Sequence, residues 1–196
     1  MIFMSISDIL ENTEMQERVE LHCHTTFSKM NGVLSVEDIF KFANNEGMSS
    51  VAFTDCANVY AYPFIQHMAE KVGNIKPIYG LEAYVADDLA DKGNVDYIRN
   101  LQEFRATILV KNEKGLRSLY KLITDSNVKY YCDYPIIPIS ELIELKENLL
   151  IGSGDEGGLL AWAIQNGQRK KNIENRYCYC RYRCKWFILC PQSWTG

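Results

Sequence analysis

The fold is decided by residues 50–85, SVAFTDCANVYAYPFIQHMAEKVGNIKPIYGLEAYV. The stretch opens with a short apolar, β-prone run at 50–55 and closes with a second one at 76–85, and the segment between them predicts a helix over about 62–72. Two buried strands joined by a helix of this length are typical of parallel pairing with a crossover. The stretch therefore predicts an α/β fold.

The same alternation continues on both sides of this stretch. Residues 19–24 form another β-prone run, and the pattern SVED, with Asp38 three residues after Ser35, predicts a capped helix start at Ser35. Further strands are predicted over 106–112 and 148–153, and further helices over 115–128 and 156–165. Parallel strands with crossover helices indicate a (β/α) barrel or an open doubly wound sheet, and both gather ligands at the carboxyl ends of their strands.

Chemically capable side chains fall at these strand ends. His22 and His24 close the first run, and because they are two residues apart on a strand they point to the same face. Two imidazoles on one face form half of a site for Zn²⁺, Mn²⁺ or Fe²⁺. The other candidate ligands are carboxylates and a thiol from later strand ends: Asp55, Cys56, Glu82 and Asp155.

The same residues also have purely structural interpretations. Asp55 would cap the turn that follows it, Glu82 would pair with a buried Lys or Arg, and Glu156 suits the first turn of a helix. His67 suits the surface of its helix. The glycine-rich turn GSGDEGG at 152–158 is similar to a phosphate-binding loop, but it lacks the Lys of a P-loop and its two acids would repel phosphate.

Composition narrows the class of protein. The 196 residues are 47% hydrophobic and 23% charged with a net charge of −4, which predicts one globular domain and argues against a broad nucleic-acid binder. No apolar run approaches the ~18 residues of a membrane span, so we expect a cytoplasmic protein without a membrane segment. Its seven cysteines are an odd number and do not indicate a disulfide framework in that compartment.

Five motifs, taken together and in order, resemble a known family: RVELHCHTTFSKMNGVLSVEDI, VAFTDCANVYAYPFIQ, KPIYGLEAYV, ATILVKNEKGLRSLYKLI and LLIGSGDEGG. They resemble the PHP (polymerase and histidinol phosphatase) domain of bacterial DNA polymerase III alpha subunits, closest to the PolC type. The resemblance covers about residues 15–167. It implies a distorted (β/α)₇ barrel, here incomplete, whose strand ends hold up to three metal ions.

Candidate ligands carry over from the family by position. His22 and His24 match its HxH motif, Glu82 matches the acid of GLEAY, and Asp55 matches the acid of a TDH motif. The resemblance thus implies a metal-dependent phosphoester hydrolase site built partly from these residues.

Four departures from the family pattern put that site in question. Asn31 stands where the family has Asp, Cys56 and Arg105 each replace a His, and Asp155 replaces a Cys. Cys56 and Asp155 can still coordinate a metal, but the guanidinium of Arg105 is permanently charged and cannot. We therefore expect a divalent metal, Zn, Mn or Fe, to bind weakly or not at all, with hydrolysis degraded.

Three segments are predicted along the chain: a leader at 1–14, a partial PHP domain at 15–167 and a tail at 168–196. The tail carries seven basic residues, one acidic residue and four of the cysteines, whereas residues 1–167 carry 14 basic and 24 acidic ones. We interpret it as a continuation read in the wrong frame. The rival interpretation is a nucleic-acid-binding or zinc-binding tail, although its cysteine spacing contains no CxxC pair.

The functional hypothesis is a PHP-domain fragment of a PolC-type replicative polymerase with a structural role. The PolC type carries an exonuclease after its GLEAY segment, whereas here VADDLADKGNVDYIRNLQEFRATILVKN crosses directly to the next strand, so we expect neither an exonuclease nor polymerisation by this chain. Its partners in the full-length family are other replication subunits and DNA, and we do not expect DNA binding by this chain alone. Two alternatives stay open: a stand-alone PHP-superfamily phosphoesterase, and a non-enzymatic replication scaffold.

Overall fold

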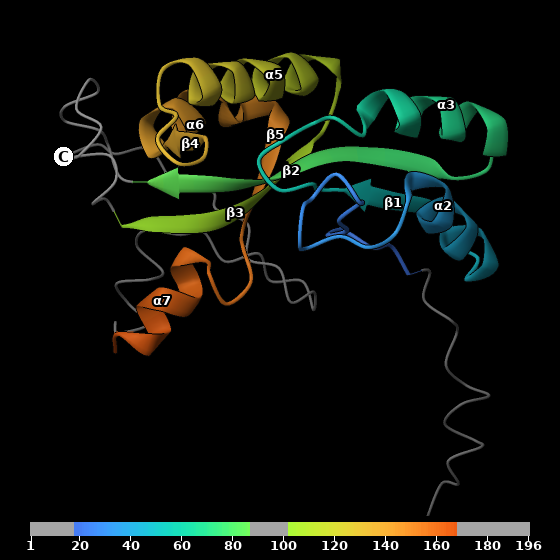
Figure 1. The fold of residues 1–196 in the computed structure, drawn as a ribbon, viewed down its shortest axis with the longest axis horizontal. Helices are drawn as coiled ribbons and strands as arrows, with labels where there is room; N and C mark the ends of the chain where they lie inside the picture. The colour runs from blue at the N-terminus through green and yellow to red at the C-terminus, as the bar shows by residue number, and fades with distance from the viewer. Residues whose placement is uncertain (1–17, 87–101, 168–196) are drawn as a thin grey trace, which may run out of the picture.

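A computed structural model describes residues 18–86 and 102–167, so the predicted leader and tail lie outside the described residues. The described strands form one sheet in the order β1-β2-β3-β5, and β4 pairs with β2 off this path. Figure 1 shows the long β2 running through the middle of the sheet. The strands are β1 (Ser50–Phe53), β2 (Lys76–Ala86), β3 (Glu103–Val110), β4 (Ile136–Pro138) and β5 (Leu149–Ser153).

One strand runs against the others. β1 and β4 pair with β2 in parallel, whereas β3 is antiparallel to both β2 and β5. The α/β class is confirmed, but the parallel pairing predicted for the strand after β2 is wrong. The reason is that no helix pattern separates the two strands in the sequence, and an antiparallel neighbour needs no helical crossover. The reversal places the beginning of β3 beside the end of β2.

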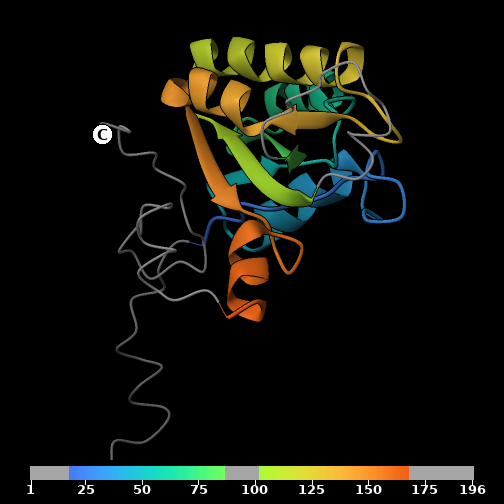
Figure 2. The same cartoon turned by 90° about the vertical axis from the view of Figure 1, so that its left-hand side faces the viewer.

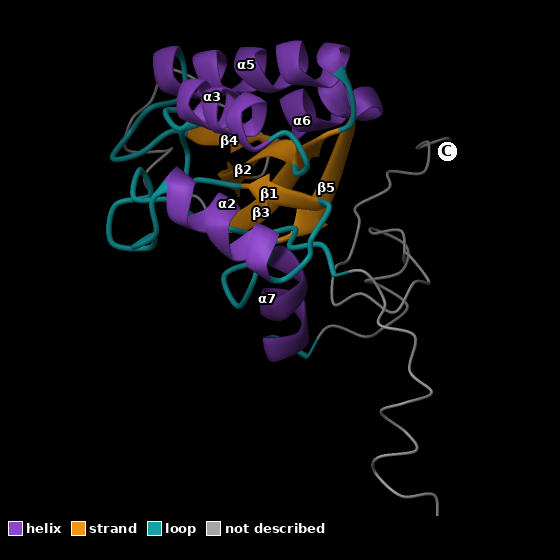
Figure 3. Ribbon diagram, turned by 90° about the vertical axis from the view of Figure 1, so that its right-hand side faces the viewer, coloured by secondary structure: helices purple, strands orange, loops and turns teal. Residues whose placement is uncertain are grey.

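Helices cover the sheet on two sides. α3, α5 and α6 lie along one side and α7 lies on the other, while α2 lies beside β1 and α3 (Figures 1, 2 and 3). None of the helices in the described part of the chain has the length and apolar character needed to cross a membrane. The helices are α2 (Val36–Asn45), α3 (Tyr62–Val72), α5 (Glu113–Val128), α6 (Ile139–Leu145), α7 (Leu159–Gln165) and the short 3₁₀ helix η1 (Lys146–Asn148).

The predicted elements are present except for one strand, and the structure adds one strand and one helix that were not predicted. The helix predicted over 62–72 is α3, and the predicted capping box of α2 is formed by the side chains and backbone of Ser35 and Asp38. The run at 19–24, predicted as a strand, makes only an isolated bridge between Glu20 and Val51. β4 and α6 were not predicted, because three strand residues and two helical turns give too little periodicity to detect.

The core fixes which face of β2 carries chemistry. Leu81, Ala83 and Val85 are buried in the main apolar cluster. Because strand side chains alternate, Glu82 and Tyr84 point to the opposite face. The core is centred on large side chains that are almost completely buried: Phe40, Phe53, Ile65, Leu81, Ile108, Leu119 and Leu122.

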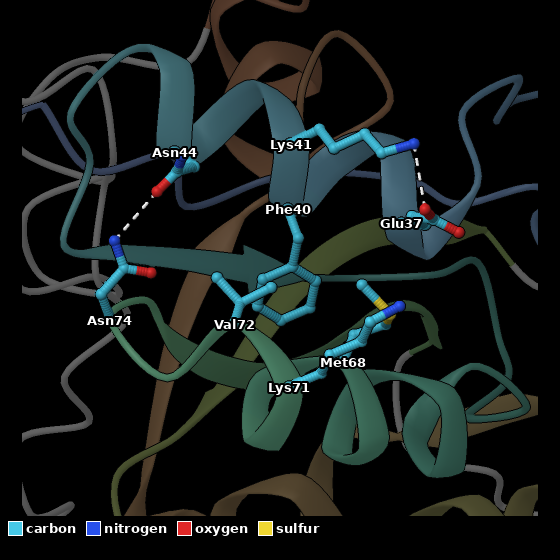
Figure 4. A pocket seen from close by; sticks show the side chains of 8 residues that line it. All are labelled: Glu37, Phe40, Lys41, Asn44, Met68, Lys71, Val72 and Asn74. Carbon is cyan, nitrogen blue, oxygen red and sulfur yellow. Dashed lines mark hydrogen bonds and ion pairs between the residues drawn. The ribbon is translucent and has the colours of Figure 1, made fainter.

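A groove of about 450 Å³ lies between α2 and α3 (Figure 4). Phe40 points from α2 toward α3 in this view, and an Asn74–Asn44 hydrogen bond of 2.9 Å closes one end. None of the eight residues lining the groove is one of the predicted metal ligands. They are Glu37, Phe40, Lys41, Asn44, Met68, Lys71, Val72 and Asn74.

Candidate metal centre

Three predicted ligand atoms converge at one point. His24 Nε2 lies 3.0 Å from His22 Nε2 and 3.0 Å from Glu82 Oε2, and His22 Nε2 lies 3.6 Å from the same carboxylate oxygen. No other group of three or more metal-ligating side chains comes together within residues 18–86 and 102–167. We call these three residues the His–His–Glu cluster.

The two imidazoles are aimed by the segment that runs beside β1. The backbone N–H of Thr54 donates to the carbonyl of Cys23 at 2.8 Å, and the N–H of Cys23 donates to Thr54 Oγ1 at 3.1 Å. The Cys23 side chain packs against the core. His22 and His24 therefore point to the other face, as predicted, and their rings meet edge to face with centroids 4.7 Å apart.

Glu82 supplies the only carboxylate of the cluster and is 3% exposed. Burial works to raise the pKa of Glu82, but hydrogen bonds from His22, His24 and Cys56 outweigh it and hold the pKa well below its usual value. The carboxylate is therefore ionised at neutral pH. Its Oε2 faces the histidines, and its Oε1 accepts a hydrogen bond from Arg105 Nη1 at 3.3 Å.

Cys56 touches the cluster without completing it. Its Sγ donates to Glu82 Oε2 at 3.1 Å and lies 3.5 Å from His24 Nδ1, the ring nitrogen that is not in the cluster. Asn31 Nδ2 donates to the same sulfur at 3.2 Å. Burial raises the pKa of the Cys56 thiol to about 11, so the sulfur is protonated at neutral pH.

Asp55 lies next to the cluster in a structural role. Its buried carboxylate accepts from the backbone N–H of Thr25 at 2.7 Å, from Thr25 Oγ1 at 2.7 Å and from Ser28 Oγ at 2.6 Å. These donors tie the loop after His24 to the end of β1. The structure thus brings Asp55 near the predicted site but does not place it among the three clustered ligands.

Asp155 is exposed and stays outside the cluster, in the glycine-rich turn at 152–158. The turn's N–H groups are used within the protein: Gly154 donates to the Arg105 carbonyl at 2.9 Å and Gly158 to the Asp155 carbonyl at 3.0 Å. The N–H of Gly157 donates to Asp155 Oδ1 at 3.1 Å. The resemblance to a phosphate-binding loop is therefore not carried by the backbone, because these donors are already satisfied.

The donor chemistry of the cluster fits a divalent cation. Ligands about 2.0–2.1 Å from a tetrahedral zinc lie roughly 3.3 Å from one another, and the three separations observed here are 3.0, 3.0 and 3.6 Å. Two imidazoles and one carboxylate are also a ligand set used for zinc in proteins. The cluster can therefore hold one cation.

The comparison with protein families agrees with the motifs. The chain matches the PHP domain over residues 20–181, which is most of its length. The chain belongs to the PHP domain family. This match confirms the resemblance to the PHP domain, and the His–His–Glu cluster is the group of side chains in the described part of the chain that could hold a metal ion.

The curated relatives are much longer proteins. The chain is 30% identical over 169 residues to DNA polymerase III subunit alpha of Borreliella burgdorferi and 32% identical over 162 residues to that of Campylobacter jejuni. These matches cover 86% and 81% of this chain but only 14% and 13% of the relatives. A shorter match, 46% over 83 residues, links 42% of the chain to 6% of the PolC-type DNA polymerase III of Thermotoga maritima.

Among solved structures, one similar chain is assigned as a metal-dependent phosphoesterase of Bifidobacterium adolescentis. The two share 15% sequence identity with a TM-score of 0.40, over 57% of this chain and 33% of the other.

Sequence reasoning missed two residues that organise the site. Ser28 Oγ contacts His24 Nδ1 at 3.2 Å, donates to Asp55 and accepts from the Cys56 backbone N–H at 2.9 Å, so it links three of the predicted site residues. A serine in a loop gives no pattern from which this role could be read. Arg105 was discounted as a ligand, yet it lies against the cluster, because β3 runs antiparallel to β2.

Proposed function

We propose that this chain serves as the PHP domain of a replicative polymerase of the DNA polymerase III alpha type, with a structural role and one weak cation site. Support comes from the family match and from curated relatives that are DNA polymerase III subunits. In this role the domain works in the cytoplasm beside other replication subunits and DNA. Recognition of DNA rests with regions other than this acidic chain.

The observation that carries the proposal is the fate of the candidate ligands. Of the candidate ligands, only His22, His24 and Glu82 converge within the described residues, whereas the Asp55 carboxylate accepts three hydrogen bonds and Asp155 is exposed in a turn. A centre of several cations needs more donors than this cluster offers. The one carboxylate is moreover shared with a guanidinium. These contacts support a single, weakly held Zn, Mn or Fe ion and a degraded hydrolase.

Metal when bound would supply a polarised water or a counter-charge for a phosphate. The residues themselves would do three things: the imidazoles and Glu82 would hold the ion, Ser28 would orient His24, and Asp55 would fix the loop on which His24 and Ser28 lie. A protonated Cys56 would serve as a hydrogen-bond donor to Glu82.

The test is the metal content and activity of the purified 196-residue chain. We expect less than one equivalent of Zn, Mn or Fe after dialysis, and no hydrolysis of p-nitrophenyl phosphate with either Zn²⁺ or Mn²⁺ added. Two or three ions retained per chain would overturn the proposal.

The runner-up function is a stand-alone phosphoesterase, favoured by the convergence of the His–His–Glu cluster. Hydrolysis of the phosphomonoester by the wild-type chain, lost on changing His22→Ala and Glu82→Ala together, would establish it. An Asp155→Asn variant is the matched control, because Asp155 lies outside the cluster and its change should leave such activity intact.

A further inference from the structure

Arg105 is the one cation in direct contact with the His–His–Glu cluster in the part of the chain that the structure describes. Its Nη1 donates to Glu82 Oε1 at 3.3 Å, while the other oxygen of the same carboxylate faces the two histidines. The Glu82 side chain is 3% exposed and the Arg105 side chain 35% exposed. The pair is therefore screened by water less than a surface pair would be.

Arg105 is held in place by contacts with β2 and with the glycine-rich turn. In the antiparallel register Arg105 lies opposite Tyr84, and its guanidinium carbon is 5.9 Å from the centre of that ring. Its backbone N–H donates to the carbonyl of Gly157 at 3.0 Å, and its carbonyl accepts from Gly154. The pair of backbone bonds fixes residue 105 between β2 and the glycine-rich turn.

Gly154 and Gly157 of the turn pack directly against Arg105, with no room for a Cβ at Gly154. A Cβ at Gly154 would lie 2.7 Å from Arg105 Cβ and 2.7 Å from its carbonyl oxygen. A Cβ at Gly157 would lie 3.2 Å from Arg105 Cδ. Close packing on Arg105 thus accounts for Gly154 and Gly157 without a phosphate ligand.

We propose that Arg105 sets the cation affinity of the His–His–Glu cluster: its fixed charge neutralises Glu82 and weakens the binding of a divalent cation. Glu82 contributes the only carboxylate of the cluster, and the guanidinium of Arg105 offsets its negative charge, which lowers the attraction for a cation. Without the guanidinium the same ligands present one full negative charge. This inference rests on the proposed cation site and names the residue that limits it.

The expected size of the effect follows from electrostatics. A unit charge within a few ångströms of a divalent cation changes a binding constant by at least about tenfold even when it is screened as strongly as in bulk water. Removing the charge of Arg105 should therefore tighten zinc binding by this factor. A distant surface arginine should have no such effect, because water and salt screen it.

The experiment measures zinc affinity of the full chain by competition with a chromophoric chelator at neutral pH. Arg105→Gln should bind Zn²⁺ at least about tenfold more tightly than wild type, while Arg105→Lys, which keeps the charge, should stay within about threefold. Arg117→Gln is the matched control, because Arg117 pairs with Glu113 on the exposed face of α5. Its affinity should equal that of wild type.

A second readout locates the ion and monitors folding. Zinc should raise the melting temperature of Arg105→Gln more than that of wild type, because tighter binding stabilises the folded state further. The double variant Arg105→Gln with His22→Ala should lose this gain. An Arg105→Gln variant that melts cooperatively and binds zinc no better than wild type, or not at all, would overturn the inference.

The two proposals fail in different ways. Two or three tightly bound ions in the wild-type chain would overturn the proposed function. The ratio of the affinities of Arg105→Gln and wild type decides the role of Arg105 alone.

Discussion

Two arginine–glutamate pairs in this chain have the same chemistry and opposite surroundings. Arg117 and Glu113 pair across one turn of α5 at 2.6 Å, with side chains 79% and 78% exposed. Arg105 and Glu82 pair across two strands at 3.3 Å, with side chains 35% and 3% exposed. The exposed pair has the shorter distance, yet the partly buried pair is the one that contacts the His–His–Glu cluster.

Surroundings, more than distance, determine what each pair does. Exposed ion pairs contribute about 0–1 kcal/mol, since water and salt screen them and both side chains lose freedom. A pair with one buried partner behaves differently, because removing either member leaves a charge in a place with little water. The two pairs should therefore differ in the stability that is lost when one member is removed.

Changing Glu82→Ala should cost the most stability. The variant leaves Arg105 partly buried without its carboxylate and removes the acceptor shared by His22, His24 and Cys56. We expect a loss of about 2–3 kcal/mol in the free energy of unfolding, below the range for fully buried pairs because Arg105 is partly exposed. Urea unfolding followed by circular dichroism measures it.

The matched variant Glu113→Ala should change stability by less than about 0.5 kcal/mol, as for a screened surface pair. Equal losses in the two variants would remove the distinction between the pairs.

The packing around Arg105 gives the second prediction. Gly154→Ala should cost about 1–3 kcal/mol, because the new methyl would meet the Cβ and carbonyl oxygen of Arg105, which cannot move without shifting β3. Gly157→Ala should cost less than about 1 kcal/mol, since its methyl would meet only flexible side-chain atoms at 3.2 Å or beyond. Thermal unfolding of both variants checks the order, and a larger loss at Gly157 would contradict the described contacts.

Third, Arg105→Gln measured in chelator should lose about 1.5 kcal/mol of stability, the low end of the range for one hydrogen bond to a charged group. Glu82 keeps its contacts with the histidines and Cys56, which limits the loss. Arg117→Gln should lose less than about 0.5 kcal/mol. A gain in stability for Arg105→Gln under these conditions would show that the ion pair is unfavourable to the fold.

The smallest effect should come from Thr107, which lies opposite Glu82 on β3. Its hydroxyl is buried, and in the described part of the chain it has no hydrogen-bond partner. Thr107→Val should therefore raise stability by up to about 1 kcal/mol, because it removes an unsatisfied polar group at constant shape.

Thr25→Val tests the same exchange where the hydroxyl is bonded, to Asp55 at 2.7 Å. It should lower stability by about 1–3 kcal/mol, because Asp55 would lose a donor in a buried setting. A stabilising Thr25→Val would mean that Asp55 does not need this bond.

The sequence was informative about the strand ends and less so about the strands themselves. His22, His24 and Glu82 could be predicted to meet, because alternation and the position of strand ends determine where such side chains point. The reversed direction of β3 was missed, since a buried strand has the same apolar pattern in either direction and the one signal for it was the lack of a helix pattern between β2 and β3. Consequently Arg105 was recognised as a departure from the family but not as a contact of Glu82.

Local hydrogen bonds were the second feature that the sequence could not predict. Asp55 has the residue type and the position of a ligand, and only the structure shows that its carboxylate accepts hydrogen bonds from Thr25 and Ser28. The run at 19–24 is β-prone, yet it makes one bridge to β1, because the N–H of Cys23 donates to the Thr54 side chain and the N–H groups of Leu21 and His22 donate to the Glu20 side chain. Such exchanges of backbone for side-chain partners leave no trace in hydrophobic periodicity.

An anomalous diffraction map at the zinc edge, from crystals of the full chain soaked in Zn²⁺, would show whether the His–His–Glu cluster binds a single cation. We expect one peak, bonded to His22 Nε2, His24 Nε2 and Glu82 Oε2 at about 2 Å, with Arg105 still on the other carboxylate oxygen. Several peaks near the His–His–Glu cluster, or a single peak bonded to Asp55 or Asp155 in place of the histidines, would contradict a single cation site at the cluster.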